Sequence, residues 1–381
     1  MSSAQSRDPL EELRALYGLG SRALREFSVV APKCSLAFGA SGIAYALART
    51  AQLRGDCDLL LAADSWVAAA QRHASDERAF VLRAPRFTRR DLGFASLVFA
   101  EPGLPHVKAI VRSQMGDRAG ADAAALQFLE MANTRLSRIA DLHLGGLGLA
   151  LGAKNLTSSV SSAKLRRELA NFGHSVVRRA WAKTGTKIRR NRPFGFAHGI
   201  AGQVYATYAC GEPSLAAPII EQLREAAIPH QKILVWTERA GGSRFSAGWC
   251  NGLAGHLLLW TTIWRHSRAG ADREIVDRLA SGVWKWRASM GSVCCGGAGQ
   301  AITLAGTAAA TGNLSGRRKI SEWLGSLQPR WPTDHNHRQS LIHGRLGFLL
   351  ARMECEYAAR PQFPVYEHQS HERERRKIKA N

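Results

Sequence analysis

The sequence lacks long hydrophobic runs. None of its 381 residues belongs to a stretch of roughly 18 uninterrupted apolar residues, the length that a membrane span requires. Residues 1–13 carry charges and have no apolar core of the kind that marks a secretory signal. We therefore expect neither membrane insertion nor secretion, and a cytoplasmic location fits best.

A regular cysteine framework is also missing. The seven cysteines are odd in number and scattered from Cys34 to Cys355, unlike the paired spacing of small disulfide-rich secreted domains. Free thiols are expected in a reducing compartment, where they can bind metal.

Acidic residues are few relative to basic ones, 30 against 52, and the formal net charge is +22. Such a balance attracts anionic partners, but the zinc-finger, RRM and basic-zipper signatures are absent, so nucleic-acid binding is not expected. The default interpretation is a positively charged helical surface. The basic residues concentrate at Lys164, Arg166, Arg167, Arg178, Arg179, Lys183, Lys187, Arg189, Arg190 and Arg192, and again at Arg373, Arg375, Arg376, Lys377 and Lys379.

A Gly-x-x-Gly element recurs along the chain, each time followed by an apolar run. The interval between the first two pairs is about twice the others, which predicts a hidden unit at Gly93, with Ser96 replacing its second glycine. This makes seven units of about fifty residues. The recognisable pairs are Gly39/Gly42, Gly145/Gly148, Gly199/Gly202, Gly252/Gly255, Gly296/Gly299 and Gly344/Gly347.

Segments with helical periodicity lie between the glycine elements, for example 58–72 and 213–228, and strand-type alternation is nearly absent. Each unit reads as a buried helix followed by an amphipathic helix that covers it. Seven pairs can stack as an open solenoid or close into a ring, and no polar terminal repeat is visible. We predict an all-α fold, an α/α toroid or double-layered α-barrel of seven helix-pair repeats. The expected divisions are an N-terminal helical extension (1–30), a single toroid domain (31–360) and a basic, flexible tail (361–381).

In a closed ring the glycine turns share one end of the inner barrel, so side chains beside them converge. Cys250, Cys294 and Cys295 flank these turns, whereas the other four cysteines do not. Three thiolates suit tetrahedral zinc, and three protein ligands leave an open position, as in catalytic sites. The alternative is that they are buried cysteines acting as small hydrophobes.

Histidines also accompany the turns: His198 and His343 directly precede a glycine, and His143 lies two residues before one. Most histidines near helix starts are hydrogen-bonded surface or core residues, but His198 shares its ring with the predicted metal. Asp141 lies four residues before Gly145 and can orient an imidazole or accept a proton. Its alternative role is a helix N-cap.

Three motifs together resemble the LanC-like lanthionine cyclases, in the order and approximate spacing of that family. They are AHGIAG, GWCNGLAG and CCGGAG, at 197–202, 248–255 and 294–299, and the resemblance runs from about Cys34 to Arg352. It implies a seven-unit α/α toroid that binds Zn²⁺ and adds a peptide cysteine thiolate to dehydroalanine or dehydrobutyrine, closing a thioether ring. It also implies that His198 protonates the resulting enolate and that Asp141 assists.

The sequence departs from the common family pattern at the site. Cys295 occupies a place that is histidine in most members, which resembles a smaller Cys-Cys-Gly group whose third ligand is also a thiolate. Ser246 stands where many members have arginine, with Arg244 two residues earlier, and Asn251 replaces an aromatic residue or histidine. The changes at Ser246 and Asn251 concern substrate positioning and the acid/base details, not the metal. The candidate positioning residues are Arg244, Asn251, His143 and His343.

The chain is too short to add a dehydratase or kinase domain to such a toroid. A dehydrated precursor peptide is the expected partner, together with a separate dehydratase or kinase/lyase, and the basic segment 164–192 is a candidate dock for an acidic leader peptide. Two alternatives stay open: glutathione-type thiol addition in trans, and a non-catalytic zinc-containing scaffold. Sugar-processing toroids need paired carboxylates, and Asp91 and Asp141 are the only obvious acids at the glycine turns.

Overall fold

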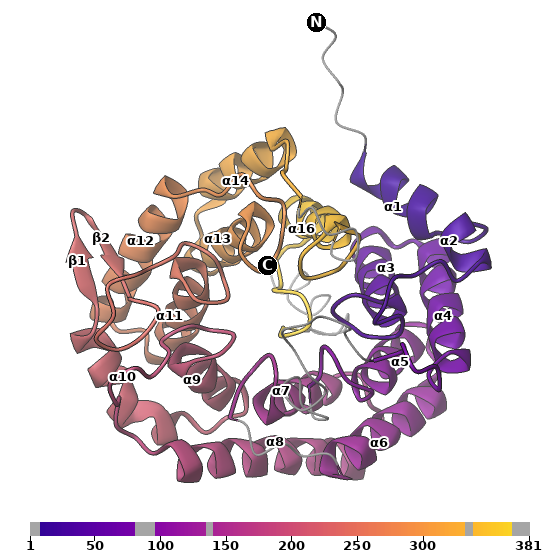
Figure 1. The fold of residues 1–381 in the computed structure, drawn as a ribbon, viewed down its shortest axis with the longest axis horizontal. Coiled ribbons are helices and arrows are strands. Elements are labelled where there is room, and N and C mark those ends of the chain that lie inside the picture. The colour runs from indigo at the N-terminus through magenta and orange to yellow at the C-terminus, as the bar shows by residue number, and fades with distance from the viewer. Residues whose placement is uncertain (1–7, 81–95, 135–139, 332–337, 368–381) are drawn as a thin grey trace, which may run out of the picture.

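The chain folds into two concentric layers of helices around a central axis (Figure 1). A computed structural model describes residues 8–80, 96–134, 140–331 and 338–367. The predicted all-α toroid, with two layers of helices, is confirmed. The inner layer comprises α3 (Ala40–Arg54), α5 (Gly103–Gln114), α7 (Gly146–Leu156), α9 (Ile200–Ala209), α11 (Leu253–Ser267), α13 (Gly297–Thr311) and α16 (Arg345–Tyr357). The outer layer contains α4 (Cys57–Arg72), α6 (Arg118–Thr134), α8 (Ala163–Thr184), α10 (Ala217–Glu225), α12 (Gly270–Lys285) and α14 (Leu314–Ser326).

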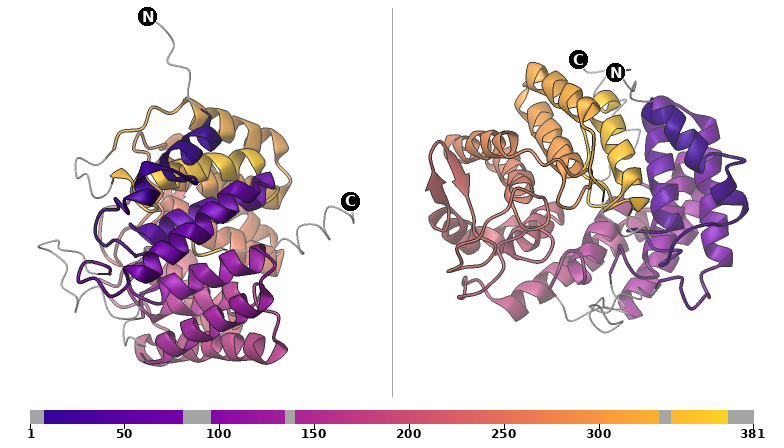
Figure 2. Two further views of the ribbon diagram at one scale, coloured as in Figure 1. Left: turned by 90° about the vertical axis from the view of Figure 1, so that its right-hand side faces the viewer. Right: turned by 45° about the horizontal axis from the view of Figure 1, so that its top comes forward.

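The ring closes between its last and first inner helices, since α16 packs against α3 as the other inner helices pack against their successors. The two further views in Figure 2 show outer helices lying along the inner ones. Additional short elements are α2 (Arg22–Arg25), the 3₁₀ helix η1 (Pro213–Ala216) and a hairpin of β1 (Ile228–His230) and β2 (Ile233–Val235).

Helix α1 (Pro9–Tyr17) completes the outer layer by packing against α16. Its Leu13 is fully buried, and its Glu12 forms an ion pair with Arg345 at the start of α16. The sequence predicted an N-terminal extension here. In the structure this helical segment lies in the outer layer, where α1 packs against both α16 and α3 and so covers the junction at which the ring closes.

The second glycine of each turn allows the inner helix to cross closely over the preceding loop. A Cβ on Gly347 would lie 1.9 Å from the carbonyl oxygen of Leu341. Gly103 has the same surroundings, because a Cβ added to it would lie 2.4 Å from the carbonyl oxygen of Leu97. Gly103 therefore marks the second unit. The predicted Gly93 lies outside the described residues, and Ser96 lies in the loop before α5, so the placement of this unit at Ser96 was wrong.

Gly347→Ala is expected to destabilise the fold by about 3 kcal/mol, because the added methyl overlaps a backbone oxygen that cannot move independently. Gly325→Ala in α14 is the matched control: nothing lies within 4 Å of its added Cβ, and alanine favours a helix by up to about 1 kcal/mol. Urea unfolding of the two variants measures the difference. Equal midpoints would contradict this account of the turn.

A ring of hydrogen bonds joins the seven glycine turns. In each bond the residue two places before the first glycine position donates its backbone N–H to the equivalent residue of the next unit. At the remaining junction Ser96 Oγ donates to His143 O (2.7 Å). The backbone bonds run from Ala37 N to Val98 O (2.8 Å), His143 N to Ala197 O (3.1 Å), Ala197 N to Cys250 O (2.8 Å), Cys250 N to Cys294 O (3.3 Å), Cys294 N to Ile342 O (3.0 Å) and Ile342 N to Ala37 O (3.4 Å).

The last described residues, 361–367, hereafter the C-terminal segment, are packed among the inner helices. Phe363, Val365 and Tyr366 are all buried. The toroid therefore continues through these residues, beyond the boundary at 360 expected from the sequence, because their apolar side chains gain by burial. The basic residues that follow, 368–381, lie outside the described part of the chain.

Candidate metal centre and catalytic dyad

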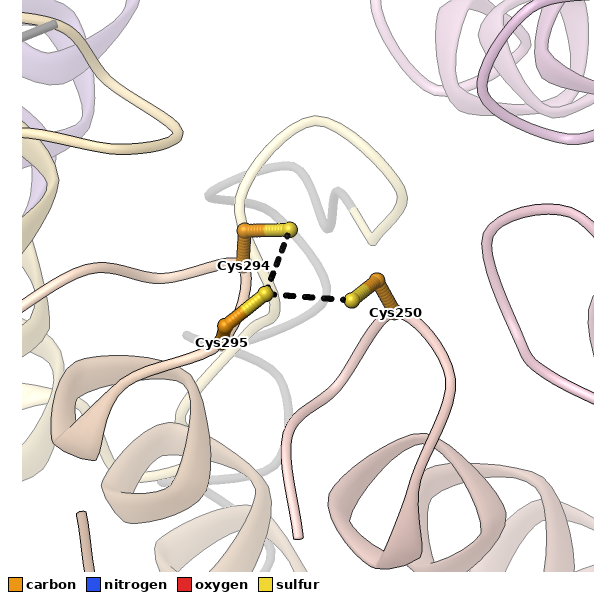
Figure 3. Close-up of side chains that lie close together, drawn as sticks. All are labelled: Cys250, Cys294 and Cys295. Carbon is orange, nitrogen blue, oxygen red and sulfur yellow. Dashed lines mark hydrogen bonds between the residues drawn. The ribbon is translucent and has the colours of Figure 1, made fainter. Parts of the chain in front are cut away.

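The three cysteines beside the glycine turns converge at one end of the inner barrel (Figure 3). The Sγ atom of Cys295 lies 3.2 Å from that of Cys250 and 3.4 Å from that of Cys294. Among the described residues, this is the one group of three or more His, Cys, Asp or Glu side chains close enough together to hold a metal ion. All three are free thiols.

The ring of backbone bonds explains why residues far apart in the sequence meet here. Cys250 and Cys294 occupy the same position in successive turns, and the N–H of Cys250 donates directly to the carbonyl of Cys294 (3.3 Å). Cys295 follows in the chain, and its N–H donates to Ser292 Oγ (3.2 Å), which fixes the turn. Backbone contacts therefore bring the three cysteines together.

The geometry and chemistry of the cluster fit a thiophilic metal. Tetrahedral Zn–S bonds of about 2.3 Å place sulfur atoms about 3.8 Å apart, only slightly farther than the observed separations. Cys250 and Cys294 are buried, whereas Cys295 is exposed, so one side of the cluster remains accessible. A metal here would have three protein donors and an open position.

Without a cation, the surroundings favour a thiolate at Cys295 alone among the three cysteines. Hydrogen bonding with Cys250 and Cys294 lowers the pKa of Cys295, and the neighbouring imidazoles of His343 and His198 lower it further. Hydrogen bonding with the other two thiols, together with burial, raises the pKa of Cys294 well above its usual value. Three thiolates this close require a cation to ionise together. The N-termini of α11 and α13, directly after the cysteines, also favour thiolates.

Asp141 and His198 form a hydrogen-bonded pair at the same end of the barrel. Asp141 Oδ2 accepts a hydrogen bond from His198 Nδ1 at 3.0 Å. Its Oδ1 accepts from the backbone N–H groups of His143 (2.8 Å) and Leu144 (2.6 Å). The carboxylate thus closes the turn before α7 and contacts the imidazole, but it is not the N-cap of α7, which is Gly145. The bond at Nδ1 leaves Nε2 of His198, a partly exposed side chain, available to exchange a proton.

The remaining histidines lie close by. His143 is buried, with its ring centroid 5.7 Å from that of His198. His343 is half-buried and stacks on Phe38 at 5.8 Å, and its imidazole acts electrostatically on Cys295. Both candidates therefore belong to the neighbourhood of the cysteine cluster.

The other two candidate positioning residues, Arg244 and Asn251, have surroundings that differ from those of the two histidines. The side chain of Arg244 is exposed and makes no hydrogen bond or ion pair with the described residues. Asn251 is half-buried and lies against Gly195 of the preceding turn. Ser246 accepts the N–H of Leu253 with its backbone carbonyl (3.0 Å). Asp91, the second acid considered for a carboxylate pair, lies outside the described residues.

Sequence reasoning missed an aromatic group beside the cysteines. Trp249 stacks on Phe363 and Tyr366 of the C-terminal segment, with ring centroids 4.6 and 5.3 Å apart. The sequence feature that could have predicted this group is the apolar content of residues 361–366, which is unusual for a solvated tail.

Comparison with known proteins agrees with this architecture. The solved structure of nisin cyclase superposes with a TM-score of 0.67 at 12% sequence identity, over 94% of this chain and 96% of that chain. No curated protein sequence gives a significant match. No helix in the described part of the chain is long and apolar enough to cross a membrane. The sequence profile described as "Lanthionine synthetase C-like protein" matches residues 31–368, and the chain therefore belongs to the lanthionine synthetase C-like family.

Proposed function

We propose that the protein is a zinc-dependent lanthionine cyclase, which adds a cysteine thiolate of a ribosomally made peptide to a dehydroalanine or dehydrobutyrine of the same peptide. The observation that carries the proposal is the convergence of a three-thiol cluster and the Asp141–His198 pair at one end of the barrel. A structural zinc site usually has four protein ligands, and this cluster has three.

Cys250, Cys294 and Cys295 would hold the zinc ion, which, when bound, lowers the pKa of a thiol that reaches its open position. His198 Nε2 accepts the proton that the substrate thiol gives up. Asp141 holds the imidazole in the tautomer that leaves Nε2 free and stabilises the imidazolium. The sulfur then bonds to the β-carbon, and the imidazolium returns its proton to the α-carbon, so the product is an isomer of the substrate.

The substrate must arrive already dehydrated, because the reaction at this site consumes a carbon–carbon double bond and does not create one. We propose that a separate dehydratase or kinase/lyase supplies it. Helix α8 and the loop after it expose Lys164, Arg167, Arg179, Lys183 and Arg190, and this surface would suit an acidic leader peptide.

The test uses the zinc-loaded full-length protein and a synthetic peptide that contains one dehydroalanine and one cysteine. Ring closure leaves the mass of the peptide unchanged, so the readout is loss of thiol alkylation, with a scrambled peptide that lacks dehydroalanine as the control. The proposal requires time-dependent loss that stops when the protein is stripped of zinc. If added glutathione is consumed in preference to the peptide thiol, the reaction is addition in trans; if neither thiol is consumed, the protein is not a cyclase.

A further inference from the structure

The C-terminal segment contributes a hydroxyl group to the neighbourhood of the dyad. Tyr366 is 1% exposed, and its Oη lies 2.6 Å from Nδ1 of His143. His143 in turn has its ring 5.7 Å from that of His198 and 6.0 Å from that of Trp249, the residue before the first cysteine of the cluster. Tyr366 and His143 thus extend the polar site beyond the Asp141–His198 pair.

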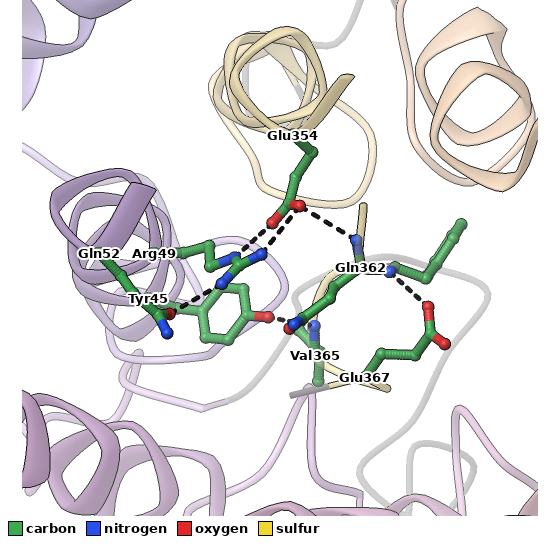
Figure 4. Close-up of polar contacts among 8 residues, drawn as sticks. Tyr45, Arg49, Gln52, Glu354, Gln362, Val365 and Glu367 are labelled. Atoms are coloured by element: carbon green, nitrogen blue, oxygen red, sulfur yellow. Dashed lines mark hydrogen bonds and ion pairs between the residues drawn. The ribbon is translucent and has the colours of Figure 1, made fainter. Parts of the chain in front are cut away.

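The position of the segment is fixed by buried polar contacts (Figure 4). Val365 has φ of +72°, a strained conformation for a β-branched residue that persists only where the surroundings impose it. Glu354, which anchors the segment, forms a fully buried ion pair with Arg49 (2.6 Å). The anchoring bonds run from Val365 N to Tyr45 Oη (3.0 Å), Asn155 Nδ2 to Val365 O (2.9 Å) and Gln362 N to Glu354 Oε2 (3.0 Å).

The environment determines the direction of the bond between Tyr366 and His143. Burial raises the pKa of Tyr366 well above its usual value, and burial, followed by the charges of His198 and His343, lowers the pKa of His143. Both groups are therefore neutral. Tyr366 Oη has no other hydrogen-bond partner among the described residues, so its proton would be buried without an acceptor unless it is donated to Nδ1. This places the single ring proton of His143 on Nε2.

The Nε2–H group of His143 is a hydrogen-bond donor that no described residue satisfies. Among the described residues, the ring nitrogens of His143 make one hydrogen bond, between Nδ1 and Tyr366 Oη. His143 retains 5% of its surface exposed, and its ring lies 5.7 Å from that of His198. A neutral imidazole held in this way does not exchange protons near neutral pH, but it can stabilise negative charge on an oxygen atom.

We propose that His143 is a further catalytic residue, whose Nε2–H donates to the carbonyl oxygen of the dehydroamino acid, and that Tyr366 is the residue that positions it. This inference rests on the proposed cyclase function. When the sulfur–carbon bond forms at the β-carbon, the π electrons of the double bond move to the carbonyl oxygen as an enolate. His143 stabilises that oxygen, and the proton held by His198 then reaches the α-carbon and restores the carbonyl.

The first test does not depend on activity. Full-length zinc-loaded protein labelled with ¹⁵N-histidine should show His143 as a neutral Nε2–H tautomer in proton–nitrogen correlation spectra, with the signal assigned by its absence from His143→Phe. In Tyr366→Phe the tautomer should shift toward Nδ1–H, because Nδ1 loses its donor. An Nδ1–H tautomer in the unsubstituted protein would overturn the inference, whatever the protein catalyses.

The second test uses the synthetic dehydroalanine peptide. His143→Phe should lower kcat by about 10²–10³-fold, the usual effect of removing one donor to a developing oxyanion. Tyr366→Phe should lower kcat at least tenfold with KM unchanged within twofold. Tyr45→Phe is the matched control, since it removes another hydroxyl that anchors the same segment, through Val365, but not the one bonded to His143, so its loss of kcat should be clearly smaller than that of Tyr366→Phe.

Each outcome of the second test bears on a different claim. Equal losses in Tyr366→Phe and Tyr45→Phe would mean that the segment is only structural. Full activity in His143→Phe would remove the proposed donor. If the unsubstituted protein does not consume the peptide thiol, the cyclase proposal fails, while the tautomer measurement still decides how Tyr366 and His143 are bonded.

Discussion

Asp141→Asn is expected to lower kcat by about 10²–10⁴-fold while leaving the fold and the zinc content unchanged. The amide oxygen of asparagine can still accept the N–H groups of His143 and Leu144, so the turn keeps these two hydrogen bonds. Its NH₂ group, however, then faces Nδ1 of His198 in place of a carboxylate oxygen. The imidazole must accept at Nδ1 and carry its proton on Nε2, and it can no longer take a proton from the substrate.

The measurement compares the rate of thiol loss from the dehydrated peptide with metal content and thermal unfolding of the same sample. Asp141→Ala provides the second variant, because it also removes the hydrogen bonds that close the turn and should cost about 1 kcal/mol of stability in addition to activity. A kcat for Asp141→Asn within threefold of the unsubstituted protein would show that His198 is not oriented by this carboxylate during the reaction.

Cys294→Ala is expected to abolish both stoichiometric zinc binding and cyclase activity. The apparent binding free energy of a zinc site, about 10–16 kcal/mol, is shared among its ligands, so loss of one thiolate should weaken affinity by roughly 10²–10³-fold. Metal content after dialysis, measured by elemental analysis, and thiol alkylation of the peptide report the two effects. Cys57→Ala is the control, because Cys57 is an exposed thiol at the start of outer helix α4 and away from the cluster.

Cys295→His separates the number of donors from their charge. It retains three donor atoms but replaces one anionic thiolate with a neutral imidazole. The resulting ligand set of two cysteines and one histidine is the one that the family resemblance implies for most members. We expect zinc to remain bound and the rate of thiol addition to fall, because less negative charge surrounds the nucleophile. Full zinc occupancy in Cys294→Ala, measured in parallel, would contradict the assignment of the cluster as the metal site.

Much of this arrangement follows from local sequence patterns. The glycine pairs predicted the inner helices because close approach of a helix to the preceding loop excludes a side chain at that position, as at Gly347. The cysteine cluster was predictable because Cys250 and Cys294 lie at equivalent positions of such turns. The second unit was misplaced because Ala100 replaces its first glycine, so that only Gly103 marks the turn, and a nearby Gly93 mimics the pattern.

The role of the C-terminal segment could not be predicted, because it depends on contacts between residues distant in the chain. Val365 is bonded to Tyr45 and Asn155, and Tyr366 to His143, all more than 200 positions away. No periodicity relates these residues. What the sequence does contain is a short apolar cluster before the basic end of the chain, which predicts burial but not the location of the buried residues.

The packing of the first helix against the last inner helix has a consequence for biosynthesis. Helix α1 leaves the ribosome well before its packing partner α16, which starts at Arg345. At about 5–20 residues per second, the two are separated by roughly 20–70 s, during which α1 can contact α2, α3 and α4 of its own chain but not α16. On crowded polysomes, α1 of one nascent chain can meet α16 of another, so exchange of this helix between two copies is the misassembly that the topology invites.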